Sequence, residues 1–191
     1  MIGDDVRRAS ESSAGSAPSA SPGRLTAFYE GARVLVTGGM GFIGSTLARR
    51  LNALGAEVAV LDNLNPGQGG NPANLEDIAS KLEIRIGDQA DAALVTEMVR
   101  GRAVVFNLCG RSAHMDSLRD PFGDLHANTA AQLTLLEAIR QHNPDARVVF
   151  AGTRSQYGRT RTLPVHEDHP QVPADINGAN KAAAERYHLI Y

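Results

Sequence analysis

The stretch Thr37-Gly38-Gly39-Met40-Gly41-Phe42-Ile43-Gly44 directly follows the apolar run Val34-Leu35-Val36. An apolar run followed by spaced glycines is typical of a strand that turns into a helix around a phosphate. In such a turn Gly38 supplies the tight bend, Gly41 lets the backbone approach a pyrophosphate, and Gly44 lets the helix pack closely on the sheet. The free N–H groups at the helix start then face the anion. The stretch therefore predicts a nucleotide-cofactor site.

The next segments of the chain support this interpretation. Residues 42–54 carry apolar side chains at helical spacing, and Gly55 stands where a helix C-cap is expected. A second apolar strand, residues 57–62, follows and ends in Asp62. An acidic residue about 20 positions after the glycines is expected to bind the ribose hydroxyls of the adenosine half. No Arg or Lys lies beside Asp62 to neutralise a 2′-phosphate, so the sequence favours NAD over NADP.

Composition limits the class of protein. The 191 residues are 42% hydrophobic with a formal net charge of -2, which allows one substantial core and gives no polycationic bias toward nucleic acid. The longest apolar runs are strand-sized, short of the roughly 20 residues that span a bilayer, so no membrane partner is expected. The single Cys109 excludes a disulfide framework and a cysteine-based metal site, and it favours a reducing, cytoplasmic compartment. No metal site is predicted.

The chain divides into a leader and one α/β domain. Residues 1–27 are rich in Ser, Ala, Gly and Pro and lack a signal-peptide core, so we expect a disordered leader. From residue 32 to 191 strand-like and helix-like segments alternate, which predicts a Rossmann-type doubly wound parallel sheet with helices on both faces. The expected strands are 33–37, 57–62, 82–86, 103–108 and 146–151, and the expected helices are 42–54, 91–100, 124–142 and 177 to the end. The last helical pattern has no stop signal, so we expect an incomplete domain whose C-terminal substrate region is missing.

Several ordered motifs resemble one known family, the extended short-chain dehydrogenases/reductases, and within it the NAD-dependent epimerases and dehydratases of nucleotide-diphosphate sugars. The resemblance covers roughly residues 32–191. The motifs are TGGMGFIG at 37–44, LDNL at 61–64, GD at 87–88, NLCG at 107–110, the helix around Asn128, AGTRSQYG at 151–158, and Lys181 followed by Glu185.

The resemblance implies a cofactor site for NAD. Gly38, Gly41, Phe42, Ile43 and Gly44 would surround the pyrophosphate, and the other implied contacts come from four later segments. These are Asp62 and Asn63 at the adenosine ribose, Asp88 with its neighbour Gln89 at the adenine, Leu108, Cys109 and Gly110 along the central stretch, and Lys181 at the nicotinamide ribose. From the residues alone, Asp88 could equally cap the following helix.

The resemblance also implies catalytic positions, and one of them departs from the family pattern. Thr153 matches the hydroxyl residue that binds the reacting sugar hydroxyl, and Lys181 would lower the pKa of a neighbouring acid or base. The family's catalytic tyrosine, four residues before that lysine, is Asn177 here. An amide cannot remove a proton as a phenolate does.

Three explanations of Asn177 stay open. Another residue serves as base, with His114, Asp116, Tyr157 and Asp175 as candidates. Of these, histidine is the residue type that commonly acts as a base near neutral pH, although His114 could instead be a hydrogen-bonding residue at the surface or lining a pocket. Alternatively Thr153 and a water carry a slow reaction, or the protein binds NAD and a ligand without turnover.

The leading hypothesis is an NAD-dependent enzyme that epimerises a nucleotide-diphosphate sugar by transient oxidation and hydride return. The alternatives are a dehydratase or decarboxylase with atypical acid/base residues and a non-catalytic NAD-binding protein. Family dehydratases resembling this chain carry an Asp-Glu pair where Arg154 and Ser155 stand, which argues against dehydration. Arg154 could bind a substrate phosphate or carboxylate. The helices 124–142 and 177 onward resemble those of a family dimer interface, so a homodimer is expected.

Overall fold

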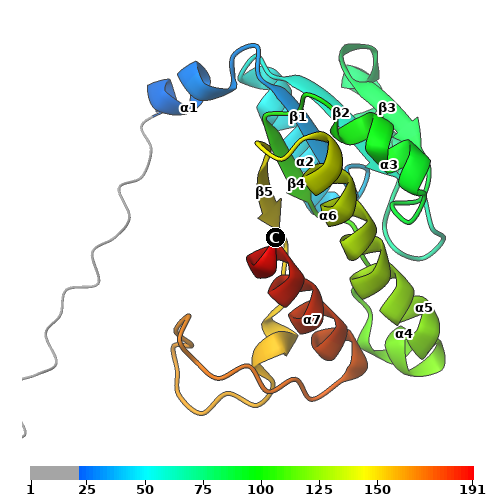
Figure 1. Ribbon diagram of the computed structural model, residues 1–191, viewed down its shortest axis with the longest axis vertical. Coiled ribbons are helices and arrows are strands. Elements are labelled where there is room, and N and C mark those ends of the chain that lie inside the picture. The colour runs from blue at the N-terminus through cyan, green and yellow to red at the C-terminus, as the bar shows by residue number, and fades with distance from the viewer. Residues whose placement is uncertain (1–21) are drawn as a thin grey trace, which may run out of the picture.

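The structure is a computed structural model that describes residues 22–191. A five-stranded parallel sheet in the order β3-β2-β1-β4-β5 forms its centre (Figure 1). The strands are β1 (Arg33–Thr37), β2 (Glu57–Asp62), β3 (Glu83–Ile86), β4 (Val104–Asn107) and β5 (Arg147–Phe150). The helices are α1 (Pro22–Tyr29), α2 (Phe42–Ala53), η1 (Pro72–Lys81), α3 (Ala92–Val99), α4 (His114–Arg119), α5 (Pro121–Leu125), η2 (His126–Ala130), α6 (Ala131–His142), η3 (Arg154–Tyr157) and α7 (Ile176–Ile190).

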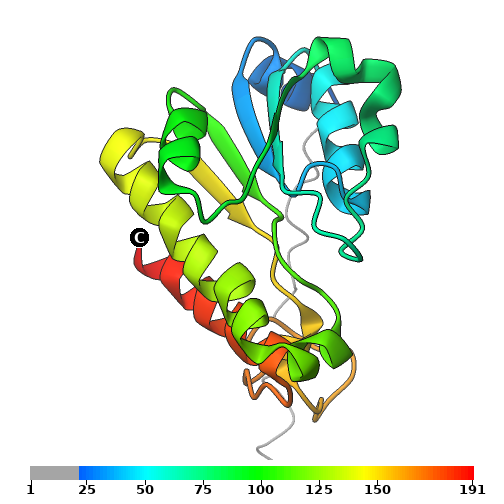
Figure 2. The ribbon, with the colours of Figure 1, turned by 90° about the vertical axis from the view of Figure 1, so that its right-hand side faces the viewer.

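Helices cover both faces of the sheet, and the alternation of side chains along β1 explains how. Val34 and Val36 point to the face covered by α2 and η1, whereas Leu35 points to the face covered by α3 and α6. The turned view in Figure 2 shows α2 and α6 on opposite sides of the sheet. This arrangement confirms the predicted doubly wound α/β fold.

The parallel register brings the carboxyl ends of the strands to one edge. Thr37 pairs with Leu61 on β2 and with Asn107 on β4, so the segments that follow β1, β2 and β4 start side by side. In open α/β sheets this edge, at the point where strand order reverses, is the place where ligands bind. Here the reversal lies between β1 and β4.

Two parts of the chain differ from the sequence-based expectation. Residues 1–21 of the predicted leader lie outside the described residues, but residues 22–27 belong to α1, whose Phe28 contacts Tyr29 edge-on and lies under the Arg147 guanidinium. The expected helix 124–142 begins earlier, at Pro121, and has a π-helical segment at His126–Ala130. In the described part of the chain no helix is long and apolar enough to cross a membrane.

Candidate cofactor and catalytic site

A cavity of about 320 Å³ opens at the carboxyl edge of the sheet. Its lining comes from the glycine-rich turn after β1, the loops after β2 and β4, and the first residue after β5. Most of the predicted cofactor-binding residues are brought together there: Gly38, Gly41, Phe42, Ile43, Gly44, Asp62, Asn63, Leu108, Cys109 and Gly110. The volume falls within the range of small-molecule sites.

At two positions of the glycine turn a side chain would overlap backbone atoms of another residue. Gly38 has φ +65°, and a Cβ there would lie 2.9 Å from the Leu108 carbonyl carbon. A Cβ on Gly44 would lie 2.2 Å from the Gly38 carbonyl oxygen. Gly41 differs, because a Cβ there would lie 3.4 Å from its nearest protein atom, an ordinary contact. The fold therefore requires glycine at 38 and 44, whereas glycine at 41 leaves open space at the start of α2.

Asp62 fixes this turn from the end of β2. One carboxylate oxygen accepts the Met40 N–H at 2.9 Å, and the other accepts the Leu64 N–H at 2.9 Å. The carboxylate is buried, 8% exposed, yet it lines the cavity. Because a carboxylate has about four acceptor positions, Asp62 can hold the turn and still accept hydrogen bonds from a ligand.

Several features of the cavity fit a dinucleotide. The first-turn N–H groups of α2 have no partner within the helix and suit a pyrophosphate. Phe42 and Ile43 are 85% and 65% exposed at the cavity rim, where a bound ligand would cover their apolar surface. The loop after β2 contributes Asn65, Gln68, Gly69 and Gly70, which were not predicted although the sequence there is rich in glycine and polar residues.

Three predicted cofactor residues do not line the cavity. Asp88 accepts the side-chain N–H of Asn63 at 2.9 Å, so it contacts a lining residue, and Asp91 instead caps α3. Gln89 points the other way: it is 1% exposed and donates to Gln132 Oε1 at 3.1 Å on α6. The structure thus places the Gln89 side chain in the packing against α6.

Lys181, the third, is buried directly beside the cavity. Its Nζ donates to the Ala151 carbonyl at 3.4 Å, and a Cβ on Gly110 would lie 2.7 Å from that Nζ. Both Ala151 and Gly110 line the cavity. Burial lowers the pKa of Lys181, an effect opposed by the nearby Asp124 carboxylate. Burial also raises the pKa of the Cys109 thiol to about 11, so this lining residue carries no charge near neutral pH.

Thr153 follows β5 and begins η3. Its Oγ1 accepts the Ser155 N–H at 3.3 Å, and its own N–H donates to Gln156 Oε1 at 2.6 Å. The hydroxyl hydrogen of Thr153 remains available to a ligand. Thr153 stands two residues after the cavity residue Ala151.

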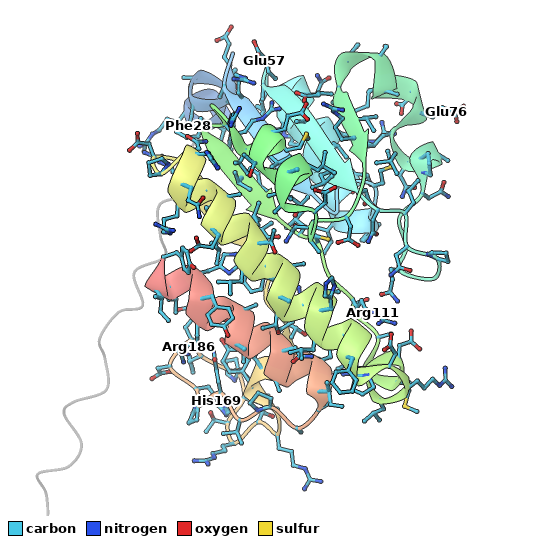
Figure 3. The ribbon with its side chains drawn as sticks, turned by 45° about the vertical axis from the view of Figure 1, so that its right-hand side comes forward. Phe28, Glu57, Glu76, Arg111, His169 and Arg186 are labelled. Atoms are coloured by element: carbon cyan, nitrogen blue, oxygen red, sulfur yellow. The ribbon has the colours of Figure 1, made fainter. Side chains whose placement is uncertain are left out.

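The Asn177 side chain is buried and hydrogen-bonded to the loop after β4 and to α5. It is 2% exposed, and its amide nitrogen donates to the Arg111 carbonyl at 2.9 Å and to Asp124 Oδ2 at 3.1 Å. Asn128 holds the same loop by donating to the Arg111 carbonyl at 3.1 Å. Figure 3 shows Arg111 beside the lower end of α6, on the segment that leaves the sheet after β4. Asn177 therefore ties α7 to this loop and offers no titratable group.

The candidate bases have different surroundings. His114 Nδ1 lies 3.0 Å from Asp175 Oδ2, and its Nε2 lies 3.5 Å from Ser155 Oγ. Asp116 pairs with Arg119 on its own helix at 3.5 Å. The Tyr157 ring packs edge-on against His169, which lies in the loop before α7 (Figure 3). Among residues 22–191 no cluster of His, Cys, Asp or Glu could hold a metal ion.

Comparisons with known proteins identify the family of this chain. The model of the NAD dependent epimerase/dehydratase family matches residues 34–191. The chain is 34% identical over 156 residues to UDP-glucose 4-epimerase of Azospirillum brasilense, covering 81% of this chain and 43% of that protein. It is 34% identical over 159 residues to dTDP-glucose 4,6-dehydratase of Mycolicibacterium smegmatis, covering 80% and 46%.

A solved structure shows the same fold. UDP-glucose 4-epimerase from Brucella ovis in complex with NAD superposes with a TM-score of 0.76 at 28% identity, covering 84% of this chain and 47% of that one. The chain thus spans about half the length of the relatives it matches. Because the family match extends over most of the chain and includes the whole site, the chain belongs to the NAD-dependent epimerase/dehydratase family.

Proposed function

We propose that this chain supplies the NAD-binding and proton-transfer parts of a nucleotide-sugar epimerase. Such an enzyme oxidises one sugar carbinol to a ketone and returns the hydride to the opposite face. The observation that carries the proposal is the cavity at the carboxyl edge, which is lined by the glycine turn, by Asp62, and by Gly110 and Ala151, the neighbours of the buried Lys181. Similarity to the Azospirillum brasilense UDP-glucose 4-epimerase supports this substrate class.

The cofactor would be held along the edge of the sheet. Gly41 and the start of α2 would receive the pyrophosphate, and Asp62 with Asn63 would bind the adenosine ribose. Lys181 would bind the nicotinamide ribose. Bound NAD supplies the hydride acceptor and donor, while the protein supplies binding and orientation.

Two side chains would prepare the sugar hydroxyl for oxidation. Thr153 would hold the hydroxyl through its free hydroxyl group, close to the cavity residue Ala151. The ammonium group of Lys181 would favour the developing negative charge on oxygen, because a buried positive charge lowers the pKa of a neighbouring hydroxyl. Asn177 would only position the loop after β4, since its amide is engaged by Arg111 and Asp124.

Two other functions are weaker candidates. The bracing role of Asn177 favours a protein that binds NAD without turnover. A dehydratase has support from the Mycolicibacterium smegmatis relative, but Arg154 and Ser155 offer no carboxylic acid pair for eliminating water.

The test is chromatography coupled to mass spectrometry on a panel of nucleotide sugars incubated with the intact gene product and NAD in deuterated water. Epimerisation gives a new isomer of unchanged mass. Loss of water with deuterium uptake means dehydration. Bound NAD with no new product supports the non-catalytic alternative.

A homodimer is part of the proposal. Helices α6 and α7 lie side by side (Figure 2). Leu125 at the end of α5 and Leu189 and Ile190 at the end of α7 are exposed apolar residues. A second copy would bury such residues. Sedimentation of the intact gene product at several concentrations tests this, and a monomer at all of them would contradict it.

A further inference from the structure

We propose that His114, held by Asp175 and acting through Ser155, accepts and returns the proton of the reacting sugar hydroxyl. This inference rests on the proposed function and names the acid/base group that Asn177 cannot provide. It assigns a hydrogen-bonded chain of three side chains from three different segments: η3, α4 and the residue before α7.

Asp175 is rigidly placed for its part. It is the N-cap of α7, and its Oδ1 accepts the Gly178 N–H at 2.7 Å. Its other oxygen lies 3.0 Å from His114 Nδ1. A carboxylate at Nδ1 holds the imidazole in the form with Nδ1 protonated and leaves Nε2 as the acceptor. Asp175 thus acts as a positioning residue.

Ser155 connects His114 to the segment that carries Thr153. Its Oγ lies 3.5 Å from His114 Nε2, and its N–H is fixed on Thr153 Oγ1. A Cβ on Gly178 would lie 2.7 Å from the Ser155 carbonyl oxygen, so the first turn of α7 packs directly on Ser155. The hydrogen-bonded side chains of Asp175, His114 and Ser155 therefore lie next to position 177.

The segments that carry these hydrogen-bonded side chains leave the cavity close to them in the sequence. His114 stands two residues after the cavity residue Ser112, as Thr153 stands two residues after Ala151. The His114 side chain is 52% exposed, so the imidazole is accessible from solvent.

The proton and electron balance is as follows. The sugar O–H bond breaks and its proton passes to Ser155 Oγ, whose own proton passes to His114 Nε2. The C–H bond of the carbon that carries this hydroxyl also breaks, and its electron pair leaves as hydride to the oxidised nicotinamide dinucleotide. The sugar carbon and its oxygen then form the ketone. The imidazolium is balanced by the Asp175 carboxylate. Reversal of each transfer on the other face gives the epimer.

The first test compares steady-state rates of the intact gene product on its nucleotide-sugar substrate. His114→Gln is expected to lower kcat about 100-fold with little change in KM, because general acid–base catalysis typically contributes about 100-fold or more. Asp175→Asn keeps an acceptor for the Gly178 N–H, and we expect it to lower kcat by a smaller factor. His142→Gln, at the exposed end of α6, is the matched control and should retain wild-type rates. Added imidazole should restore part of the rate to His114→Ala, which a purely structural residue would not allow.

The second test needs no turnover. Proton NMR of the protein without ligands should show a downfield Nδ1–H signal of His114 that disappears in Asp175→Asn and persists in His142→Gln. Absence of an Asp175-dependent signal overturns the inference. Normal rates in His114→Gln overturn it while the proposed function stands, whereas an inactive wild type refutes both. Labelling of Ser155 by a fluorophosphonate would also overturn it, since this serine would then be a nucleophile.

Discussion

Replacing two glycines of the turn after β1 by alanine separates the needs of the fold from those of the ligand. In Gly44→Ala the new Cβ would lie 2.2 Å from the Gly38 carbonyl oxygen and 2.7 Å from Gly39 Cα. Both are backbone atoms that cannot rotate away. Overpacking of this kind costs about 3 kcal/mol at the upper end of its usual range, and alanine returns up to about 1 kcal/mol of helix propensity. We expect a net loss of about 2 kcal/mol, a factor of roughly 30 in the folding equilibrium.

Gly41→Ala should behave differently. The new Cβ would lie 3.4 Å from the nearest protein atom, and φ -73°, ψ 175° suits alanine. Alanine lowers the conformational entropy of the unfolded chain, which stabilises the fold, but it is a poorer N-cap than glycine. These two effects roughly cancel, so the free energy of unfolding should change by less than about 0.5 kcal/mol. The methyl group would occupy the space proposed for the pyrophosphate. A steric overlap that costs about 1–3 kcal/mol would weaken NAD binding about 5- to 150-fold.

The assays are guanidinium denaturation for stability and calorimetric titration for NAD affinity. The prediction is that Gly44→Ala loses stability and Gly41→Ala loses only affinity. Wild-type NAD affinity in Gly41→Ala would refute the reasoning, because the pyrophosphate would then not approach the backbone there.

Three further predictions concern the surroundings of the cavity. Asp62→Asn places an amide NH₂ against the Met40 or Leu64 N–H, so denaturation should show a loss of about 1–3 kcal/mol and calorimetry a weaker NAD affinity; unchanged values of both would contradict its double role. Burial raises the pKa of Cys109 in the folded protein to about 11, so alkylation of the thiol near pH 8 should be slow. The same shift contributes up to roughly 2–3 kcal/mol of stability, which is present below about pH 9 and lost by about pH 11. A pH series of denaturation curves should show this loss in the wild type and not in Cys109→Ala. Asn177→Ala removes a donor from the buried Asp124 and from the loop after β4, so unfolding should become easier by about 1.5–3 kcal/mol, and a neutral result would show that position 177 is not a brace.

The sequence predicted the sheet well because its strands are short buried runs. β1 and β2 agree with the predicted ranges. β3 begins one residue later than predicted, and β4 and β5 are each one residue shorter at both ends. The π-helical segment His126–Ala130 was not predicted, since it depends on the burial of Asn128 against the loop after β4 rather than on local periodicity. The helix η1 was also missed, although its Leu75 is fully buried under the sheet.

The site was partly predictable for a similar reason. Glycines at fixed spacing and an acidic residue at the end of β2 are local signals, and these residues meet at the cavity. Gln89 shows the limit, because neighbouring residues point in different directions and its side chain enters the packing against α6. The pairing of His114 with Asp175 was not predictable either, since it depends on how α4 and α7 pack and not on any spacing in the chain.

The most direct test of the central claim is a crystal structure of the intact gene product grown with NAD. We predict the pyrophosphate at Gly41 and the start of α2, the adenosine ribose on Asp62, and the nicotinamide ribose beside Lys181. NAD bound elsewhere, or a cavity that stays free of NAD at saturating concentration, would contradict the account.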